Sequence, residues 1–407
     1  MDTTPQEDLA ATLRKERIYV LILAAIQISH IMDFVIMMPL GPRFMRVFNI
    51  SPVEFSSLVS AYTFSAGIVG FFGALYADHF DRKKFLLFNF TGFITGTLMC
   101  ALSTNFATLL TARIIAGAFG GILNACVLSL VADLIPFQRR GTAMGVVMSS
   151  FSVSSVVGIP IGLWIANQFD WHYTFYFICI VASVFWCMSI YFLPSVRVER
   201  PKSFKANLRK FRNVFKPDYI QAFCLTSSLA FGIFHVIPFI APYLVKNVGF
   251  PEEDLPFMYL IGGIGTVITA RVVGKLTDRI GGFRVFRFLA LISVVPILAL
   301  TNLPPVAVWM ALIVTTVFTM FGSARFIPAM TMVSGVVKPE ERGTFMSLEN
   351  AGRQFSSGLA SQTAGLIIGT TAAGTLTGYN IVGVICILSS FVAIAVAASI
   401  RKKYNFQ

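Results

Sequence analysis

Charged residues are scarce in this sequence. Asp, Glu, Lys and Arg make up 13% of its 407 residues, whereas 56% are hydrophobic. Soluble domains carry about 25% charged residues, so this composition excludes an ordinary soluble protein. The sequence also lacks the HExxH pattern of zinc peptidases, a convincing GxSxG elbow and the phosphate-binding loop of ATPases. These absences argue against an intramembrane enzyme and against ATP-driven transport.

Cysteine is sparse as well, with 6 residues in the chain. All of them fall inside apolar runs, and none has the spacing of metal ligands, so we expect reduced thiols that fill space between helices. The sequence therefore predicts no metal site and no cofactor.

Long apolar runs dominate the chain instead. A helix needs about 20 residues to cross the hydrocarbon core of a bilayer, and the continuous runs differ from the alternating strands of a membrane barrel. We predict an all-α polytopic membrane protein with twelve transmembrane helices in two parallel six-helix repeats. The expected spans are approximately 18–41, 54–77, 85–103, 107–132, 142–167, 173–193, 219–245, 256–277, 285–303, 306–334, 344–369 and 378–400.

Basic residues are distributed asymmetrically between the connecting segments. With both termini in the cytoplasm, 25 of the 32 Lys and Arg lie in cytoplasmic segments, and Arg43, Arg46 and Lys246 lie outside. This asymmetry orients helical membrane proteins, so the net charge of +13 requires no nucleic-acid partner. We expect a multi-pass protein of the cell (inner) membrane with both termini cytoplasmic, surrounded by membrane lipids. The first apolar run is long enough to span, which argues against a cleaved signal peptide.

Three motifs recur in the same order in the two halves of the chain. The pairs are MMPLGPRF (37–44) with VIPFIAPYL (236–244), YADHFDRKKF (76–85) with LTDRIGGFR (276–284), and RRGTAMG (139–145) with ERGTFMS (341–347). Offsets near 200 indicate a duplication. The expected domains are an N-terminal six-helix bundle (1–194), a basic cytoplasmic linker (195–217) and a C-terminal six-helix bundle (218–407). Secondary transporters use such repeats and bind substrate between them, whereas a receptor or scaffold has no need of matched repeats with buried charges.

The same motifs resemble those of the major facilitator superfamily over nearly the whole chain. ALYADHFDRK (74–83) and its copy GKLTDRIGGFR (274–284) are similar to the signature loop G-x-L-A-D-R-x-G-R-K, and LLTARIIAGAFGG carries Arg113 and Gly117 of the fourth-span pattern L-x-x-x-R-x-x-Q-G. SSVVGIPIG (154–162) approximates an antiporter motif, with its proline displaced by one place. The resemblance is greatest to the twelve-span drug:proton antiporter and sugar-efflux branch. It implies a transporter, expected as a monomer, that moves a small molecule and protons by alternating access.

The resemblance also implies a conformational role for the charged loops. By this resemblance, Asp78 is expected to bind its loop to a helix end of the opposite half in the outward-facing state. An acid at a helix N-terminus contributes about 0.3–1 kcal/mol. The alternative is that Asp78 and Arg82 only anchor the topology. The residues assigned to this motif are Asp78, Arg82, Lys83, Gly274, Asp278 and Arg279.

Charges within the spans point to a transport pathway, because each is unfavourable by several kcal/mol unless it is paired or hydrated. Asp33 in the first span and Arg113 in the fourth lie at similar depths, about 12 Å and about 9 Å from the outer end. In related antiporters an acid and an arginine at these places serve proton coupling and substrate recognition. We predict that Asp33 carries the proton with Arg113 as its electrostatic partner; the alternative is a permanent structural ion pair.

The second half holds another set of buried charges. Glu349 and Arg353 are spaced i, i+4 in the eleventh span, and Arg325 lies at comparable depth in the tenth. This set is a candidate for substrate recognition or a second coupling site, and the alternative is that Glu349 merely neutralises Arg353. The buried arginines exceed the buried acids by one, which favours a substrate with an anionic or zwitterionic portion.

Other candidates surround these charges. His30, Phe34 and Met37 in the first span and Phe231 and His235 in the seventh are predicted substrate contacts, with ordinary packing as the alternative. Small residues and a proline are predicted to serve packing or hinge bending: Gly117, Gly158, Pro160 and Gly162. The predicted function is proton-coupled efflux of a small amphiphilic or sugar-like compound. An exporter of lysolipids or other amphiphiles and an uptake symporter on the same fold are the alternatives.

Overall fold

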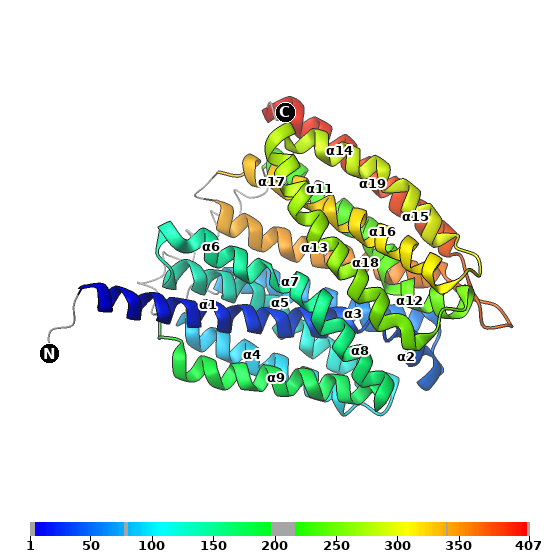
Figure 1. The fold of residues 1–407 in the computed structure, drawn as a ribbon, viewed down its shortest axis with the longest axis horizontal. Helices are drawn as coiled ribbons and strands as arrows, with labels where there is room; N and C mark the ends of the chain where they lie inside the picture. The colour runs from blue at the N-terminus through cyan, green and yellow to red at the C-terminus, as the bar shows by residue number, and fades with distance from the viewer. Residues whose placement is uncertain (1–4, 77–79, 197–215, 339–340, 405–407) are drawn as a thin grey trace.

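Helices make up nearly all of the structure. The computed structural model describes residues 5–76, 80–196, 216–338 and 341–404, and its only strands among these residues form a small hairpin (Figure 1). Eleven helical segments are long and apolar enough to cross a membrane. The remaining long helix is α18 (Arg342–Ile367), whose polar residues lower its hydropathy and which lies between the two halves. The fold is therefore the predicted all-α polytopic membrane fold.

The first half contains six spans. Their helices are α1 (Pro5–Ile36), α3 (Pro52–Tyr76), α4 (Arg82–Ala101), α5 (Phe106–Leu134), the composite of α6 (Phe137–Met148), α7 (Ser150–Val153), the π-helical η2 (Ser154–Gly158) and α8 (Ile159–Gln168), and α9 (Trp171–Phe192). Side-chain caps fix several starts: Asn105 accepts a hydrogen bond from the Thr108 N–H at 2.9 Å, and Asp170 caps α9. Such caps satisfy N–H groups that the first helical turn leaves unpaired.

The second half repeats this plan. Its elements are α11 (Pro217–Val236), η3 (Ile237–Phe239), α12 (Ile240–Tyr243), η4 (Leu244–Val248), η5 (Glu252–Asp254), α13 (Leu255–Ile280), α14 (Gly282–Ile292), α15 (Val294–Thr301), α16 (Val308–Ala324), α17 (Phe326–Val336), α18, β1 (Gly369–Thr370), β2 (Leu376–Thr377) and α19 (Tyr379–Tyr404). The predicted linker falls largely on residues 197–215, which lie outside the described residues. The predicted domain boundaries therefore stay predictions.

Two predicted spans are shorter as helices than expected, and the repeated proline motif explains both. α1 ends at Ile36 instead of reaching 41, and the seventh span is interrupted after Val236. Prolines lack the N–H that continues a helix, and they occur at Pro39 and Pro42 in one copy and at Pro238 and Pro242 in the other. The two copies meet: a Cβ on Gly41 would lie 2.9 Å from the Pro242 side chain.

The two ends of the molecule differ in how the halves are joined. We call the end that carries α2 (Gly41–Val47), α12 and the β1–β2 hairpin the hairpin end, and the end that carries the first turns of α6 and α14 and the last turn of α19 the basic end. At the hairpin end, a single hydrophobic core includes Phe44 and Phe55 of the first half and Phe239 and Tyr379 of the second. Toward the basic end the buried core divides into separate clusters, each confined to one half.

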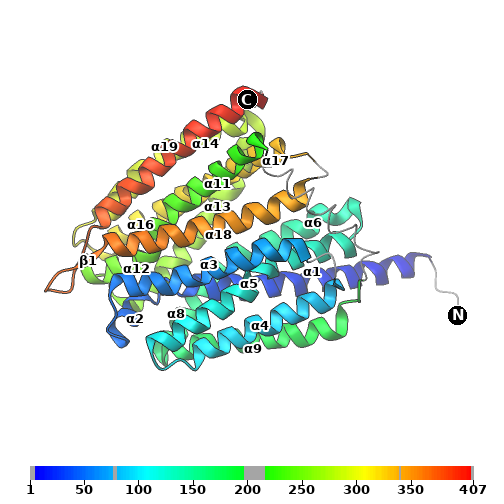
Figure 2. The same cartoon turned by 180° about the vertical axis from the view of Figure 1, so that it is seen from behind.

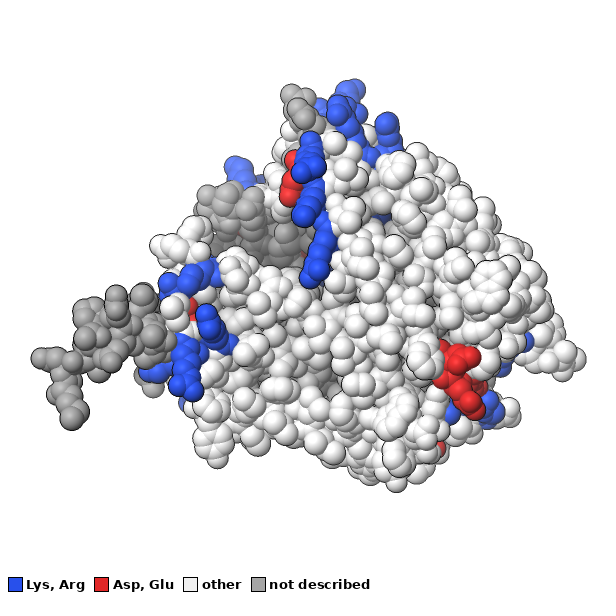
Figure 3. Space-filling view, in the orientation of Figure 1, with Lys and Arg blue, Asp and Glu red and all other residues white. Residues whose placement is uncertain are grey.

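The helices accordingly lie together at the hairpin end and diverge toward the basic end, as the two opposite views show (Figures 1 and 2). A cavity of about 580 Å³ between α3, α11 and α18 is lined by Phe71, Phe72, Phe223 and Leu348. Lys and Arg side chains gather at the basic end, and a broad uncharged belt covers the middle of the molecule (Figure 3). The molecule is thus closed at the hairpin end.

Motif residues at the basic end have defined partners. In the ERGTFMS copy, Glu341 accepts hydrogen bonds from the Tyr219 hydroxyl and the Lys216 ammonium group. These contacts, the Tyr219 hydrogen bond first among them, hold the pKa of Glu341 below its ordinary value. They also tie the start of α18 to the start of α11 within the second half.

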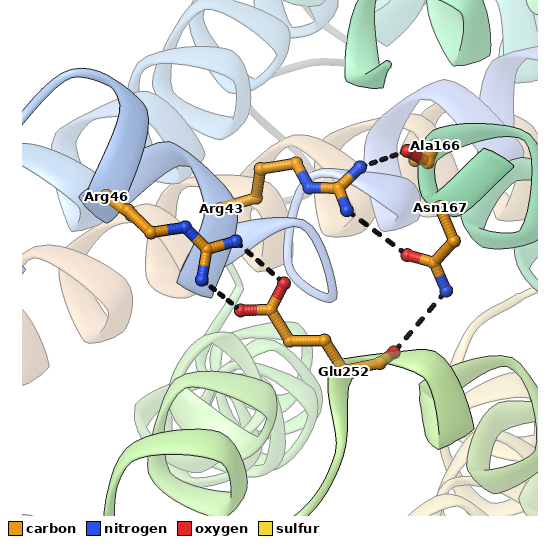
Figure 4. Close-up of polar contacts among 5 residues, drawn as sticks. All are labelled: Arg43, Arg46, Ala166, Asn167 and Glu252. Carbon is orange, nitrogen blue, oxygen red and sulfur yellow. Dashed lines mark hydrogen bonds and ion pairs between the residues drawn. The ribbon is translucent and has the colours of Figure 1, made fainter. Parts of the chain in front are cut away.

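Polar contacts join the two halves at the hairpin end (Figure 4). Arg46 of α2 forms a bidentate pair with Glu252 of η5, with Nη1–Oε1 and Nη2–Oε2 distances of 2.8 and 2.9 Å. Asn167 of α8 approaches the Glu252 carbonyl at 3.5 Å, and Arg43 donates to the Ala166 carbonyl and Asn167. Deeper in the membrane, Gln362 of α18 accepts hydrogen bonds from Ser57 and Ser60 of α3.

We expect Arg46→Glu to open the hairpin end more often, because two carboxylates then face each other in place of an ion pair. Spin labels at Val47→Cys and Ala373→Cys, after replacement of the exposed Cys187 and Cys224 by Ser, would measure this opening. The distance between the labels reports the population that is closed at the hairpin end. An exposed pair of this kind is worth about 0.2–1 kcal/mol, so the ratio of closed to open molecules should fall about 1.4-fold to fivefold.

The exchanged pair Arg46→Glu/Glu252→Arg should restore the closed population. Arg139→Glu is the matched control, since Arg139 forms a similar bidentate pair with Glu16 inside the first half. Equal effects of Arg139→Glu and Arg46→Glu on the distance would contradict a gating role for Arg46.

Candidate functional site

Asp33 and Arg113 form an ion pair inside the first half. Asp33 lies in the last turn of α1 and Arg113 in the second turn of α5, and the Nη1–Oδ2 distance is 2.8 Å. Both side chains are fully buried. Arg113 also donates to the Asp33 carbonyl at 3.3 Å, and the Thr97 hydroxyl of α4 donates to the second carboxylate oxygen at 3.1 Å. The structure thus brings together the two charges that depth alone had paired.

An aromatic layer covers this pair. The guanidinium carbon of Arg113 lies 4.4 Å from the centre of the Tyr62 ring, a distance at which cation–π attraction contributes. Tyr62 stacks on Phe34, and Phe34 stacks on Phe234 of the other half, with ring centres 5.1 and 5.9 Å apart. The layer therefore connects the buried charges of the first half to α11 of the second half.

Gly117 permits this arrangement by close helix contact. A Cβ at this position would lie 2.3 Å from the Tyr62 carbonyl oxygen, so α3 and α5 could not approach as they do with any larger residue. The approach places Tyr62 against Arg113, which lies one turn earlier on α5. The predicted packing role of Gly117 fits this geometry.

Two predicted first-span contacts lie on either side of Asp33. The His30 ring is buried, and neither of its nitrogens has a hydrogen-bond partner among the described residues. Its ring centre is 6.3 Å from that of Tyr62. Met37 is fully buried in the core of the hairpin end. His30 therefore retains free hydrogen-bonding capacity next to the charge pair, whereas Met37 fills space.

Arg325 is also fully buried, but its partners differ from those of Arg113. Its guanidinium donates to the Ser390 hydroxyl at 2.6 Å and to the Ser293 hydroxyl at 3.4 Å, and its Nε donates to the Gly322 carbonyl at 3.3 Å. These groups all belong to the second half. Within the described part of the chain, Arg325 is not bonded to Glu349 or Arg353, so the three predicted residues do not form one cluster.

Glu349 and Arg353 form a looser pair on α18. The Nε–Oε1 distance is 3.6 Å; the Glu349 side chain is 2% exposed and that of Arg353 36%. Arg353 also donates to the Asn350 side chain at 2.8 Å. The predicted i, i+4 pairing on one helix face is therefore present, with one end open to its surroundings.

The seventh-span candidates contact each other. The Nδ1–H of His235 donates to the Phe231 carbonyl at 2.7 Å, and its Nε2 forms a hydrogen bond with the Thr363 hydroxyl at 2.9 Å. The Phe231 ring packs edge-on against His235. His235 thus links α11 to α18, and its predicted contact with substrate stays a prediction.

The charged loops are only partly described. Arg82 pairs with Asp133 at the end of α5 at 3.3 Å, and Lys83 donates to the Ile190 carbonyl of α9 at 2.6 Å, both within the first half. In the copy, Asp278 and Arg279 are exposed in the last turn of α13, and Gly281 makes the turn with φ = 93°. The prediction for Asp78 falls on residues 77–79, which lie outside the described residues, and the latch stays untested. A Cβ on Gly274 would meet no atom within 4 Å.

The predicted hinge lies next to an irregular helix. Residues 154–158 are π-helical immediately before Pro160, whose missing N–H removes one helical hydrogen bond. Gly158 packs on Met32, and Gly162 packs on Ile36 and Thr174. The irregular segment therefore faces α1 close to Asp33.

Sequence reasoning missed several members of the site. Thr97 and Tyr62 contact the ion pair directly, and Arg46 and Glu252 join the halves. Thr97 could have been found from the sequence. The comparison of depths that paired Asp33 with Arg113 covered only charged residues, and Thr97 is polar but uncharged. Tyr62 carries no comparable signal, because aromatic residues are common throughout the chain.

Comparison with known proteins identifies the family. The model described as Major Facilitator Superfamily matches residues 23–361, and again residues 222–404. The chain belongs to the major facilitator superfamily. It is therefore a multi-pass membrane transporter for a small molecule, and the family and fold are not those of enzymes.

Two curated relatives of this superfamily share less than a quarter of their aligned residues with the chain. The MFS-type transporter YceJ of Bacillus subtilis is 22% identical over 350 residues, which are 86% of this chain and 89% of YceJ. Multidrug resistance protein 2 of the same organism is 24% identical over 281 residues, 67% of this chain and 70% of that protein.

Solved structures of the superfamily share the fold. A bacterial homologue of the human lysosomal transporter Spinster, in an inward-facing and unoccupied conformation, has a TM-score of 0.74 at 15% identity and covers 99% of both chains. The D-xylose–proton symporter has a TM-score of 0.74 at 16% identity, covering 92% of this chain and 96% of its own.

Arg113→Met should destabilise the protein by about 3–5 kcal/mol, because the Asp33 carboxylate then stays buried without its cation. Much of this loss should be recovered in Arg113→Met/Asp33→Asn, in which no charge remains. Unfolding midpoints of the purified variants in detergent would complete the double-mutant cycle. Arg353→Met is the control, with a smaller expected loss because its pair is looser and partly exposed. A loss in the double variant equal to the sum of the losses in Arg113→Met and Asp33→Asn would show that the pair is not coupled.

Proposed function

We propose that this protein is a proton-coupled exporter of a small amphiphilic or sugar-like compound, working by alternating access. The observation that carries the proposal is the fully buried Asp33–Arg113 pair at the junction of α1, α4 and α5. A buried charge is expensive in a membrane and is commonly part of an ion or proton pathway. The membership of the chain in a transporter superfamily supports the same reading.

Proton uptake at Asp33 supplies a coupling step. Protonation neutralises the carboxylate and weakens its bond to Arg113, and the Thr97 hydroxyl can keep its hydrogen bond to the carboxyl group. In the described part of the chain, Nε and Nη2 of Arg113 have no hydrogen-bond partner. A released Arg113 can therefore turn these donors toward an anionic or polar group of the substrate, so that protonation of Asp33 and substrate binding are coupled through one arginine.

The aromatic layer suits an amphiphilic substrate. Phe34 and Phe234 are only partly buried and belong to different halves, so a flat apolar group between them would contact both halves. Beside this layer lies the His30 ring, whose nitrogens have no hydrogen-bond partner among the residues that the structure describes. Arg353 offers a second recognition point, and Glu349 is the alternative proton carrier. Arg325, whose donors are used inside the second half, is proposed to contribute only in another conformation.

The orientation follows from the charges. We place the basic end in the cytoplasm and the protein in the cell (inner) membrane, since Lys and Arg are retained on the cytoplasmic side. The structure is then open toward the inside, ready to take up a cytoplasmic compound. Export is supported by the multidrug resistance relative, whereas the D-xylose–proton symporter among the structural neighbours keeps the opposite direction as an outcome of the test.

Asp33→Asn should abolish substrate-dependent proton movement in proteoliposomes, because no titratable group then remains at the pair. The assay compares lipophilic drugs, sugars and lysolipids, and follows internal pH and substrate together. Glu349→Gln is the matched control and should retain coupling. Opposite movement of proton and substrate identifies an antiporter, and movement in the same direction identifies a symporter.

Other results would change the assignment of the proton-carrying residue. If Asp33→Asn still moves protons while Glu349→Gln does not, Glu349 is the carrier. If the protein transports substrate without moving protons, or if neither substitution alters transport, the Asp33–Arg113 pair is structural. The protein is then a facilitator or an amphiphile exporter.

A further inference from the structure

A groove lies between the two halves at the hairpin end, away from the buried charges. It has a volume of about 470 Å³ and is formed by α8 of the first half and by η5 and α13 of the second. Its walls include Pro160, Ile161 and Trp164 on one side and Phe257 and Leu260 on the other. Trp164 and Phe257 are 55% and 59% exposed, so two aromatic rings border the opening.

Contacts between the halves bound the groove at both ends. Toward the surface, the Asn167 amide approaches the Glu252 carbonyl, and Arg46 holds the Glu252 carboxylate (Figure 4). Deeper in the membrane, α13 approaches η2 so closely that a Cβ on Gly263 would lie 3.1 Å from the Ser155 carbonyl oxygen. The groove is therefore a compartment of defined length that exists because the halves are closed here.

The polar groups of the groove are concentrated near its surface end. Asn167 and Gln168, at the end of α8, provide amide groups, and Glu253 provides a carboxylate. Glu252 next to it is occupied by Arg46, but Glu253 has no hydrogen-bond or ion-pair partner among the described residues. Pro160 lies about 12 Å from Gln168 along the α8 axis, at about 1.5 Å per residue. The groove therefore runs from a polar mouth into apolar depth.

We propose that this groove binds a membrane phospholipid with a primary ammonium headgroup, of the phosphatidylethanolamine class. The ammonium group donates to the Glu253 carboxylate, and the Gln168 and Asn167 amides donate to the phosphate or ester oxygens. The first part of an acyl chain lies along Pro160, Ile161 and Leu260, and Trp164 and Phe257 flank it at the depth where aromatic residues favour the interface. The carboxylate disfavours purely anionic headgroups, and a choline headgroup cannot donate the hydrogen bond.

Such binding favours one conformation of the transporter. The groove takes walls from both halves, so a lipid in it binds the state closed at the hairpin end and not the state in which α8 and α13 separate. A ligand shifts a conformational equilibrium by its differential affinity for the two states. The lipid therefore acts as a stabiliser of the closed hairpin end, independently of the identity of the transported compound.

Native mass spectrometry of the full-length protein, titrated with palmitoyl-oleoyl phosphatidylethanolamine, phosphatidylcholine and phosphatidylglycerol, tests the site. We expect the ethanolamine lipid to bind most tightly, and Glu253→Gln to lower its affinity about fivefold, the size of one partly exposed charge interaction. Trp164→Leu should weaken the binding of all three lipids.

Two matched controls separate this site from general surface effects. Asp254→Asn changes the same charge one residue away, outside the groove lining, and Trp309→Leu removes another exposed tryptophan, 61% exposed, outside the groove. Both should leave the affinities unchanged. Equal affinity for the ethanolamine and choline lipids, or equal losses in Asp254→Asn and Glu253→Gln, would overturn the proposal.

The conformational consequence is measured with spin labels at Val47→Cys and Ala373→Cys, after replacement of Cys187 and Cys224 by Ser. In nanodiscs that contain phosphatidylethanolamine, the closed population should be higher than in phosphatidylcholine, and Glu253→Gln should remove the difference. A lipid effect that persists unchanged in both Glu253→Gln and Trp164→Leu would place the lipid elsewhere and overturn the assignment.

Discussion

The poor solvation of charge in a membrane is the constraint on which this structure depends. Backbone groups satisfy it by forming helices, but each buried ionised side chain needs its own solution. The chain uses three. Arg113 is paired with a carboxylate, Arg325 is surrounded by hydroxyl and carbonyl groups, and Arg353 pairs loosely and keeps part of its surface exposed. These three sets of contacts differ in how easily they can be broken.

The duplication explains why the hairpin end is the closed end. Each copy of the proline motif ends its first helix early, which leaves a short turn and a small helix at the same place in both halves. The two breaks lie against each other between the halves, where Gly41 lets Phe55 and Pro242 approach. Phe55 then packs edge-on against Phe239 of the other half. One sequence feature, repeated, thereby supplies both sides of a closed interface.

The sequence was sufficient for the fold class and for the central pair, and the reason is geometric. Counting residues along a spanning helix gives the depth of a side chain, and similar depths paired Asp33 with Arg113. Depth does not give the direction in which a side chain points around its helix. That is why Arg325, at a suitable depth, is bonded to Ser390 instead of to the Glu349–Arg353 pair. Contacts between surface segments, such as Arg46 with Glu252, depend on the packing of both halves and have no signal in either segment alone.

The sizes of these interactions indicate which of them can drive a conformational cycle. Moving a two-state equilibrium from 1:99 to 99:1 requires about 5.5 kcal/mol. The exposed Arg46–Glu252 pair contributes about 0.2–1 kcal/mol, enough to bias the closed state but too little to control it. Breaking a buried pair is worth about 3–5 kcal/mol, close to what is required. Under the proposed coupling, the buried pair beside the irregular η2–α8 segment is therefore the element whose protonation has the right magnitude, while the hairpin-end contacts set the resting population.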